Sequence, residues 1–155
     1  MGDNNTMKAL YVASAGGHLA QLIAIDKFWK QHDRTWATFE LPEVKAALDG
    51  EKIDWVYFPT TRNIPNAVRN VGVAWRTLRR EKPDVVITSG AAVAVSFFAV
   101  AKILGIRTVF IEAYDRITMP TMSGRLCYPM SDLFVVQWEE QQKAFPESVN
   151  IGAIM

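Results

Sequence analysis

Short apolar runs alternate with longer amphipathic segments along almost the whole chain, and this alternation limits the fold more than any other feature. The runs are rich in Val, Ile and Phe and are bounded by polar residues, Gly or Pro, as buried strands are. They lie at Lys8–Ala13, Thr35–Glu40, Ile53–Phe58, Asp84–Ser89, Arg107–Ala113 and Asp132–Gln137. Such strands, separated by helices, form right-handed βαβ units around a covered parallel sheet. The sequence therefore predicts an α/β fold: a Rossmann-like, doubly wound, mostly parallel sheet with helices on both faces.

The segments between the runs predict the helices. Apolar residues at helical spacing indicate helices over residues 18–30, 42–48 and 91–104, a short one near 139–145, and a final strand over 149–154. The segment Pro59–Pro65 is predicted to be a loop because it is bounded by two prolines. The next helix ends before Pro83, and one of its stripes holds Ala67, Val68, Val71, Ala74, Trp75 and Leu78.

Length and composition narrow the class of protein. The 155 residues predict a flexible N-terminal tail over 1–7 and a single domain over 8–155. A net charge of +1 argues against a nucleic-acid partner. The one cysteine, Cys127, excludes a disulfide framework and a cysteine-based zinc site, and fits a small buried side chain in a reducing cytoplasm. We expect no metal, no cofactor and no secretory signal peptide.

The most apolar stretch, Val85–Ile106, carries no charge before Lys102. Thr88, Ser89 and Gly90 interrupt it, so we interpret it as a buried strand followed by an apolar helix rather than as a membrane span. That helix is apolar nearly all round, which leaves it either fully buried or partly against lipid.

A glycine–histidine turn follows the first predicted strand. Gly16 and Gly17 allow the backbone to turn tightly and approach a ligand, and His18 stands at the start of the next helix. The turn lacks the third glycine of a dinucleotide fingerprint and the Gly-Lys-Ser/Thr of a phosphate-binding P-loop. His18 is therefore either a phosphate contact or proton acceptor beside a ligand crevice, or an ordinary histidine at a helix start.

A second polar cluster follows the fifth predicted strand. Glu112 ends this strand, so we expect its carboxylate to face the same crevice as His18. Arg116 could bind phosphate or pair with Asp115, and Ser123 and Arg125 offer further anion contacts. The alternative for each is a solvated loop residue.

Basic residues gather in the helix after the Pro59–Pro65 loop. Arg69, Arg76 and Arg80 are predicted on one helical face, opposite Val71, Trp75 and Leu78. This face could lie on an anionic membrane surface, because a basic residue near such a surface contributes about 1 kcal/mol. The alternative is a solvated helix face.

Three stretches carry a resemblance to a known family: "SAGGHLAQL" (14–22), "KPDVVITSGAAVAV" (82–95), and "IEAYDRITMPTMSGRLCYPMSDLFVVQW" (111–138) with the closing "NIGAIM". The sequence resembles the bacterial PssD-type subunits of exopolysaccharide synthesis. Their eukaryotic relative is the membrane-recruiting subunit of the split dolichol-linked N-acetylglucosaminyltransferase. The resemblance implies the first, acceptor-binding half of a GT-B glycosyltransferase related to MurG, with the second half on a separate PssE-type chain.

The resemblance also implies roles for individual residues. By similarity to the glycine-rich loop of MurG, Ser14, Gly16, Gly17 and His18 would face a polyprenyl-diphosphate-linked acceptor. A UDP-sugar would be shared with the partner chain, and His18 or Glu112 would act as the base. The eukaryotic relative has an N-terminal membrane anchor that this sequence does not show. We therefore expect peripheral attachment to the inner face of the cytoplasmic membrane.

Two other functions remain open from the sequence. The chain could be a non-catalytic scaffold that recruits and stabilises the donor-binding catalytic chain. It could also be a small Rossmann nucleotide-binding protein, although the missing third glycine and the missing acidic ribose ligand disfavour this.

Overall fold

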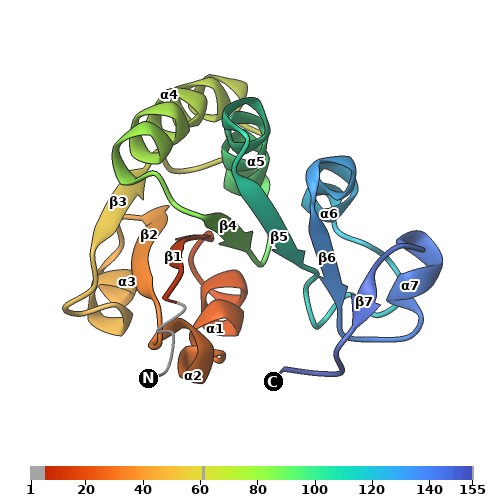
Figure 1. Ribbon diagram of the computed structural model, residues 1–155. Helices are drawn as coiled ribbons and strands as arrows, with labels where there is room; N and C mark the ends of the chain where they lie inside the picture. The colour runs from red at the N-terminus through yellow and green to blue at the C-terminus, as the bar shows by residue number, and fades with distance from the viewer. Residues whose placement is uncertain (1–5, 61, 155) are drawn as a thin grey trace.

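One parallel sheet organises the protein, whose computed structural model describes residues 6–60 and 62–154 (Figure 1). Its strands are β1 (Lys8–Val12), β2 (Asp33–Phe39), β3 (Ile53–Val56), β4 (Val85–Thr88), β5 (Arg107–Ile111), β6 (Leu133–Val136) and β7 (Val149–Asn150). Their order is β3-β2-β1-β4-β5-β6-β7, and each strand is parallel to its neighbours. The predicted Rossmann-like, doubly wound α/β sheet is confirmed. The order reverses between β1 and β4, the place where such sheets bind ligands.

Helices cover both faces of the sheet. One layer contains α1 (Gly17–Ile23), α2 (Asp26–Trp29) and α3 (Pro42–Ala47); the other contains α4 (Ile64–Glu81), α5 (Ala92–Leu104) and α6 (Met122–Cys127). Strand β1 shows the division, because Leu10 and Val12 join the core under α4–α6 while Ala9 and Tyr11 join the core under α1–α3. A 3₁₀ turn (Tyr128–Met130) and α7 (Gln141–Ala144) complete the chain.

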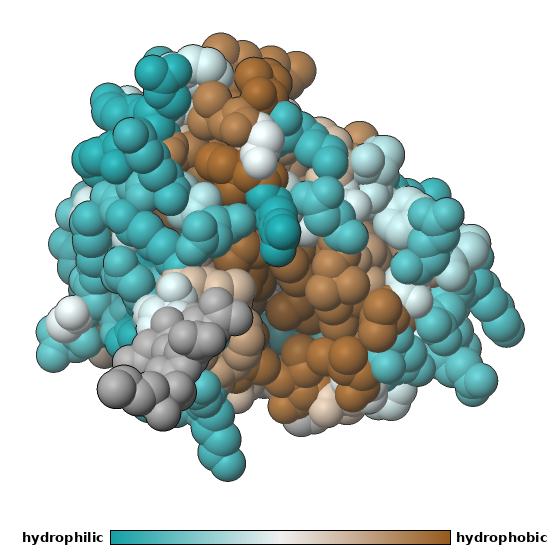
Figure 2. Space-filling model, in the orientation of Figure 1, coloured by the Kyte–Doolittle hydropathy of each residue, from teal (hydrophilic) through white to brown (hydrophobic). Residues whose placement is uncertain are grey.

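Beyond α1 and α2, no helix covers the second face of β5 and β6 in Figure 1. Right-handed crossovers explain this, because the connections after β3 all run on the α4–α6 side. Figure 2 shows apolar side chains gathered in the hollow that remains, which has a volume of about 780 Å³. Its apolar lining includes Ile25, Phe28, Val85, Ile87, Val109, Ile111 and Leu133.

Most element boundaries lie within two residues of the prediction, and three differences affect how the chain is organised. The expected helix over 18–30 is two helices, α1 and α2, and the break lets the Trp29 indole N–H donate to the Leu22 carbonyl (3.1 Å). Helix α4 begins at Ile64, inside the expected loop, because the Asn63 side chain caps it by accepting from Asn66 N (3.0 Å) and proline fits a first turn. The final strand has only two residues.

The N-terminal tail falls partly outside the described residues, since nothing is described before Thr6. Met7 is held by the fold, because its backbone N–H donates to His32 Nδ1 (3.1 Å). Strand β1 begins at Lys8, as the sequence predicts.

Helix α4 packs on the sheet with a face that the sequence pattern did not indicate. Its buried residues are Asn66, Asn70, Val73, Ala74, Thr77, Leu78 and Glu81. Asn70 explains why this face packs on the sheet. Its side chain accepts from Tyr57 N (2.8 Å) and donates to Tyr57 O (3.3 Å), just beyond β3. The predicted stripe is therefore split, with Ala74 and Leu78 buried but Val68, Val71 and Trp75 exposed.

Helix α5 is buried over part of its surface. Seven of its thirteen residues are buried between α4, α6 and the sheet, so it is not fully buried, and a contact of the remaining residues with lipid stays a prediction. Within the part of the chain that the structure describes, no helix combines the length and apolarity needed to span a bilayer.

Candidate functional site

The glycine–histidine turn after β1 is joined to the turn after β4. His18 Nδ1 lies 2.8 Å from the Ser89 carbonyl oxygen, and Ser89 Oγ donates to the His18 carbonyl (2.5 Å). Because a carbonyl oxygen can only accept, Nδ1 carries the proton in the neutral ring. This bond therefore fixes the tautomer and leaves Nε2 as the ring nitrogen that can accept a proton.

Gly90 makes room for this histidine. Its φ is +116°, and a Cβ at this position would lie 3.1 Å from His18 Cε1 and 3.2 Å from Ser123 Oγ. A side chain here would therefore be strained and would push against two residues of the site. The sequence shows a Ser-Gly pair after the fourth strand but does not reveal this contact.

A pocket of about 600 Å³ opens between these turns and α6. His18, Arg62 and Arg116 line its polar side, and Ser123 lies in its wall. The Ser123 hydroxyl accepts from Ala91 N (3.1 Å), at the start of α5. The N-cap residue Ala91 has no side-chain oxygen to bond the N–H groups of the first turn of α5, so the positive end of the helix dipole adds to the two guanidinium groups. This combination of charges suits a phosphate-containing anion.

Arg62 is a site residue that the sequence analysis missed. It lies in a loop with no recognisable motif, so nothing in the sequence marks it as a site residue. Arg116 lines the pocket, and no ion pair links it to Asp115 within residues 6–60 and 62–154. A phosphate contact by Arg116 stays a prediction.

Glu112 does not face the crevice, and the predicted orientation is wrong. Its side chain is 0% exposed, and its carboxylate accepts from Ala113 N (2.8 Å), Thr121 N (3.2 Å) and Thr121 Oγ1 (2.9 Å). The loop from 113 to 121 folds back over the strand end and takes up these oxygens. Burial, together with the Glu112 charge, raises the pKa of the nearby Cys127 thiol to about 12, and this cysteine is buried as predicted. Glu112 therefore holds the loop rather than a substrate.

Three buried glutamines position the loop that carries Arg116. Gln21 accepts from Tyr114 N (3.0 Å), Gln137 donates to Glu112 O (3.0 Å), and Gln141 donates to Ala113 O and to Arg116 O (both 2.9 Å). Gln137 ends the sixth predicted strand, whereas Gln21 and Gln141 carry no signal in the sequence. Their role depends on contacts between segments far apart in the chain.

Comparisons with known proteins identify the family. Residues 52–154 match the family model described as "Oligosaccharide biosynthesis protein Alg14 like". The human UDP-N-acetylglucosamine transferase subunit ALG14 is 30% identical over 97% of this chain and 84% of its own length. This chain belongs to the Alg14-like family. The Yarrowia lipolytica subunit of the same name is 23% identical over 96% of the chain and 81% of its own.

Solved structures confirm the fold of this Alg14-like chain. MurG from Acinetobacter baumannii superimposes with a TM-score of 0.74 at 16% identity, over 86% of this chain and 42% of MurG. A UDP-N-acetylglucosamine 2-epimerase from Rickettsia bellii gives 0.76 at 12% identity, over 97% of this chain and 46% of its own. The Alg14-like chain therefore has the Rossmann-like fold of one half of such proteins and spans less than half of their length.

The remaining predicted anion contacts are not brought to the pocket of the Alg14-like chain. Ser14 Oγ donates to Ala15 O (3.3 Å), Gly16 is exposed with φ +76°, and Gly17 lines a smaller neighbouring hollow of about 300 Å³ that His18 shares. Arg125 lines a different hollow, beside Glu140 and Lys143. The reason is helical geometry, because Arg125 lies about 200° around α6 from Ser123.

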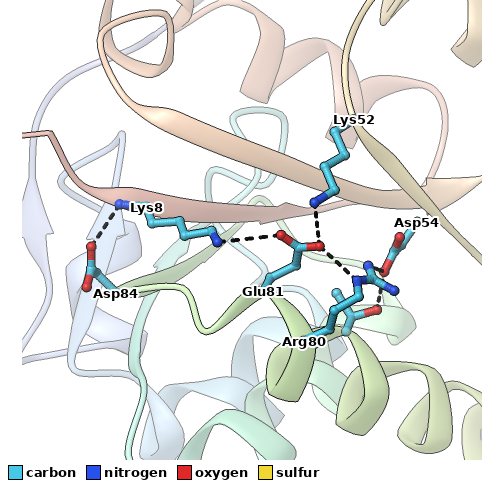
Figure 3. A network of polar contacts seen from close by, with 7 residues as sticks. Lys8, Lys52, Asp54, Arg80, Glu81 and Asp84 are labelled. Carbon is cyan, nitrogen blue, oxygen red and sulfur yellow. Dashed lines mark hydrogen bonds and ion pairs between the residues drawn. The ribbon is translucent and has the colours of Figure 1, made fainter.

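The arginines of α4 in the Alg14-like chain fall into two groups. Arg69, Arg76 and Arg79 are exposed, and the Arg79 guanidinium lies 5.6 Å from the Trp75 ring centre. Arg80 instead pairs with Asp54 and Glu81 (Figure 3). Of the apolar residues expected opposite Arg69, Arg76 and Arg80, Leu78 is buried, whereas Val71 and Trp75 are exposed. Arg79, which the predicted basic face did not include, lies beside Trp75. The membrane contact of the basic face stays a prediction.

Proposed function

We propose that this chain is the acceptor-binding subunit of a two-chain GT-B glycosyltransferase. It would transfer a sugar from a nucleotide-sugar to a polyprenyl-diphosphate-linked saccharide in cell-surface polysaccharide synthesis, as a PssD-type subunit does. One observation carries the proposal: a single pocket at the switch point combines His18, two guanidinium groups and the uncapped start of α5. A diphosphate fits the cations, and a sugar hydroxyl fits the histidine.

His18 would act as the general base. Transfer to a hydroxyl requires removal of its proton as the new bond forms, and the Ser89 carbonyl holds the ring in the tautomer that can accept one at Nε2. Glu112, the competing candidate, has its carboxylate occupied by the 113–121 loop. The diphosphate-bound sugar would then be oriented by Arg62 and Arg116.

A donor-binding partner chain of PssE type would supply the rest of the cleft. The names of the curated relatives support this, since each is a transferase subunit. The apolar hollow over β4–β6 also supports it, because large exposed apolar surfaces are typical of protein contacts. UDP-N-acetylglucosamine, the donor in the relatives' names, is the first sugar nucleotide to test.

The chain would work on the inner face of the cytoplasmic membrane as a peripheral protein. The outward stripe of α4, formed by Ile64, Val68, Val71 and Trp75, supports this together with the exposed Arg69, Arg76 and Arg79. Apolar and aromatic side chains beside arginines are typical of helices that lie in a membrane surface.

Co-expression with the second chain tests the proposal. The two chains should co-purify, and only the complex should transfer N-acetylglucosamine to a polyprenyl-diphosphate-linked sugar. His18→Ala should abolish most of this transfer without breaking the complex. A complex that forms and retains full activity with His18→Ala would instead favour a non-catalytic scaffold, and a chain that binds no partner would exclude both roles.

A further inference from the structure

The pocket that contains His18 is lined by two unlike sets of side chains. We call His18, Arg62 and Arg116 its cationic wall and the apolar side chains from α5 and α6 its apolar wall. The apolar wall includes Val95, Met122 and Leu126, together with Ala92. Met122 is 73% exposed and Leu126 is 50% exposed, so the fold itself does not bury them.

The pocket lies beside the first turns of α4, where the outward stripe of that helix begins. Ser96 Oγ donates to Ala67 O (3.2 Å), which packs the first turns of α5 against those of α4. Arg62 lies in the pocket two residues before Ile64, the first residue of the stripe, which is 77% exposed. A molecule leaving the pocket past Arg62 would therefore lie close to the stripe that we propose to contact lipid.

The ligand that fits both walls is an amphiphile with an anionic head and an apolar tail that leaves in one direction. A free phosphate or a water-soluble sugar phosphate would use only the cationic wall. Leucine and valine supply fixed apolar contacts, and methionine adapts to an irregular chain.

We infer that Val95, Met122 and Leu126 bind the first isoprene units of the acceptor lipid while Arg62 and Arg116 bind its diphosphate. This inference rests on the proposed function and adds to it a subsite that selects the lipid part of the acceptor. The lipid is then recognised by the protein itself and is more than a membrane tether.

Binding of a chain-length series to the full-length chain tests the inference. The probes are inorganic pyrophosphate, dimethylallyl diphosphate and farnesyl diphosphate, used below the concentration at which they form micelles and measured by calorimetry. Burial of an isoprene unit against a leucine-sized surface should tighten binding by about tenfold or more. Farnesyl diphosphate should therefore bind at least about tenfold more tightly than pyrophosphate.

Leu126→Ser and Met122→Ser should each remove much of this difference without changing the affinity for pyrophosphate. Ile103→Ser is the matched control, because Ile103 is also 73% exposed but lies near the other end of α5. Arg116→Ala should weaken every probe. Melting temperatures check that each variant is folded.

Two results would overturn the inference while leaving the diphosphate site intact. These are equal binding of pyrophosphate and farnesyl diphosphate, or a chain-length effect that Leu126→Ser and Met122→Ser do not reduce. Absence of binding to every diphosphate would count against both the inference and the proposed function.

Discussion

The charged residues at the two ends of the sheet differ in whether they form ion pairs. At the amino ends of the strands, Glu81 is only 4% exposed and contacts the ammonium groups of Lys8 (3.7 Å) and Lys52 (2.6 Å) and the guanidinium of Arg80 (2.9 Å) (Figure 3). At the carboxyl ends, Arg62 and Arg116 face a pocket, and no carboxylate pairs with them among the residues that the structure describes.

The contrast indicates that the ion pairs of Glu81 stabilise the fold, whereas Arg62 and Arg116 fit the anion that we propose to bind in the pocket. Burial alone would raise the pKa of Glu81, but the hydrogen bonds from Lys52 and Arg80 outweigh it and lower this pKa to about 2. Such a group contributes to stability in the free protein. The cations around His18 have no such partner, so a bound anion is what they would stabilise.

The largest expected effect is at the ligand end. His18→Ala should lower kcat of the two-chain complex by about 10²–10⁴-fold, because the proton acceptor is lost. Initial rates at saturating substrates measure this. If His18 only binds the diphosphate, the acceptor KM should rise instead and His18→Asn should restore much of the binding. Full activity of His18→Ala would remove the residue from the mechanism.

Gly90→Ala should have the next largest effect. The added Cβ meets His18 and Ser123, and displacing a catalytic side chain by about 1 Å can cost about a hundredfold in rate. Gly50→Ala is the matched control, since Gly50 also has a positive φ (+79°) but has nothing within 4 Å of its Cβ position. Both variants should lose stability through the positive φ, with the larger loss in Gly90→Ala because of its added contacts, and only Gly90→Ala should lose activity. Equal activities would show that the contact does not position His18.

At the opposite end, Glu81→Gln should change stability and not catalysis. Because the folded-state pKa lies below the ordinary value of 4.5, the carboxylate stabilises the fold above about pH 4.5, and this contribution is lost as the pH falls toward 2. Urea unfolding should show a loss of about 1–3 kcal/mol at pH 7. The difference from the wild type should narrow as the pH falls from 5 to 3. A difference that is constant with pH would contradict the ionic origin.

The smallest effect distinguishes two arginines of the same helix. Arg76→Ala should weaken binding to anionic vesicles by about fivefold, which corresponds to about 1 kcal/mol. Arg80→Ala should change it less, because Arg80 is held by Asp54 and Glu81. Flotation with anionic and neutral vesicles at low and high salt provides the measurement. Equal losses of vesicle affinity in Arg76→Ala and Arg80→Ala would show that the membrane contact does not depend on the exposed arginine Arg76 in particular.

The sequence predicted what depends on local pattern. Alternating apolar runs indicated the strands, and the turn after β1 marked His18 and its place at the switch point. The orientation of Glu112 could not be predicted, because it depends on the 113–121 loop returning to the strand end. A residue at a strand end can point into a crevice or beneath a loop, and its position in the sequence is the same in both cases.

The face of α4 could not be predicted for a similar reason. An apolar stripe normally faces the core, but here Asn70 and Thr77 bond to Tyr57 and Asp54 around β3 and turn Val68, Val71 and Trp75 outward. The departure from the usual pattern occurs where the proposed function needs exposed apolar residues. The position of Arg62 in the pocket could not be predicted either, because the fold brings it close to His18 and Arg116 from distant parts of the chain.

The central claim is that this chain binds the acceptor. Comparing the effects of one substitution on the KM for the acceptor and on the KM for the UDP-sugar tests this claim most directly. Arg116→Ala in the two-chain complex should raise the KM for the polyprenyl-diphosphate acceptor by about ten- to a hundredfold, because a charged hydrogen bond is lost from the diphosphate. The KM for the UDP-sugar should stay within about twofold, with little change in stability. An increase in the UDP-sugar KM alone would contradict the account, because the pocket would then belong to the donor.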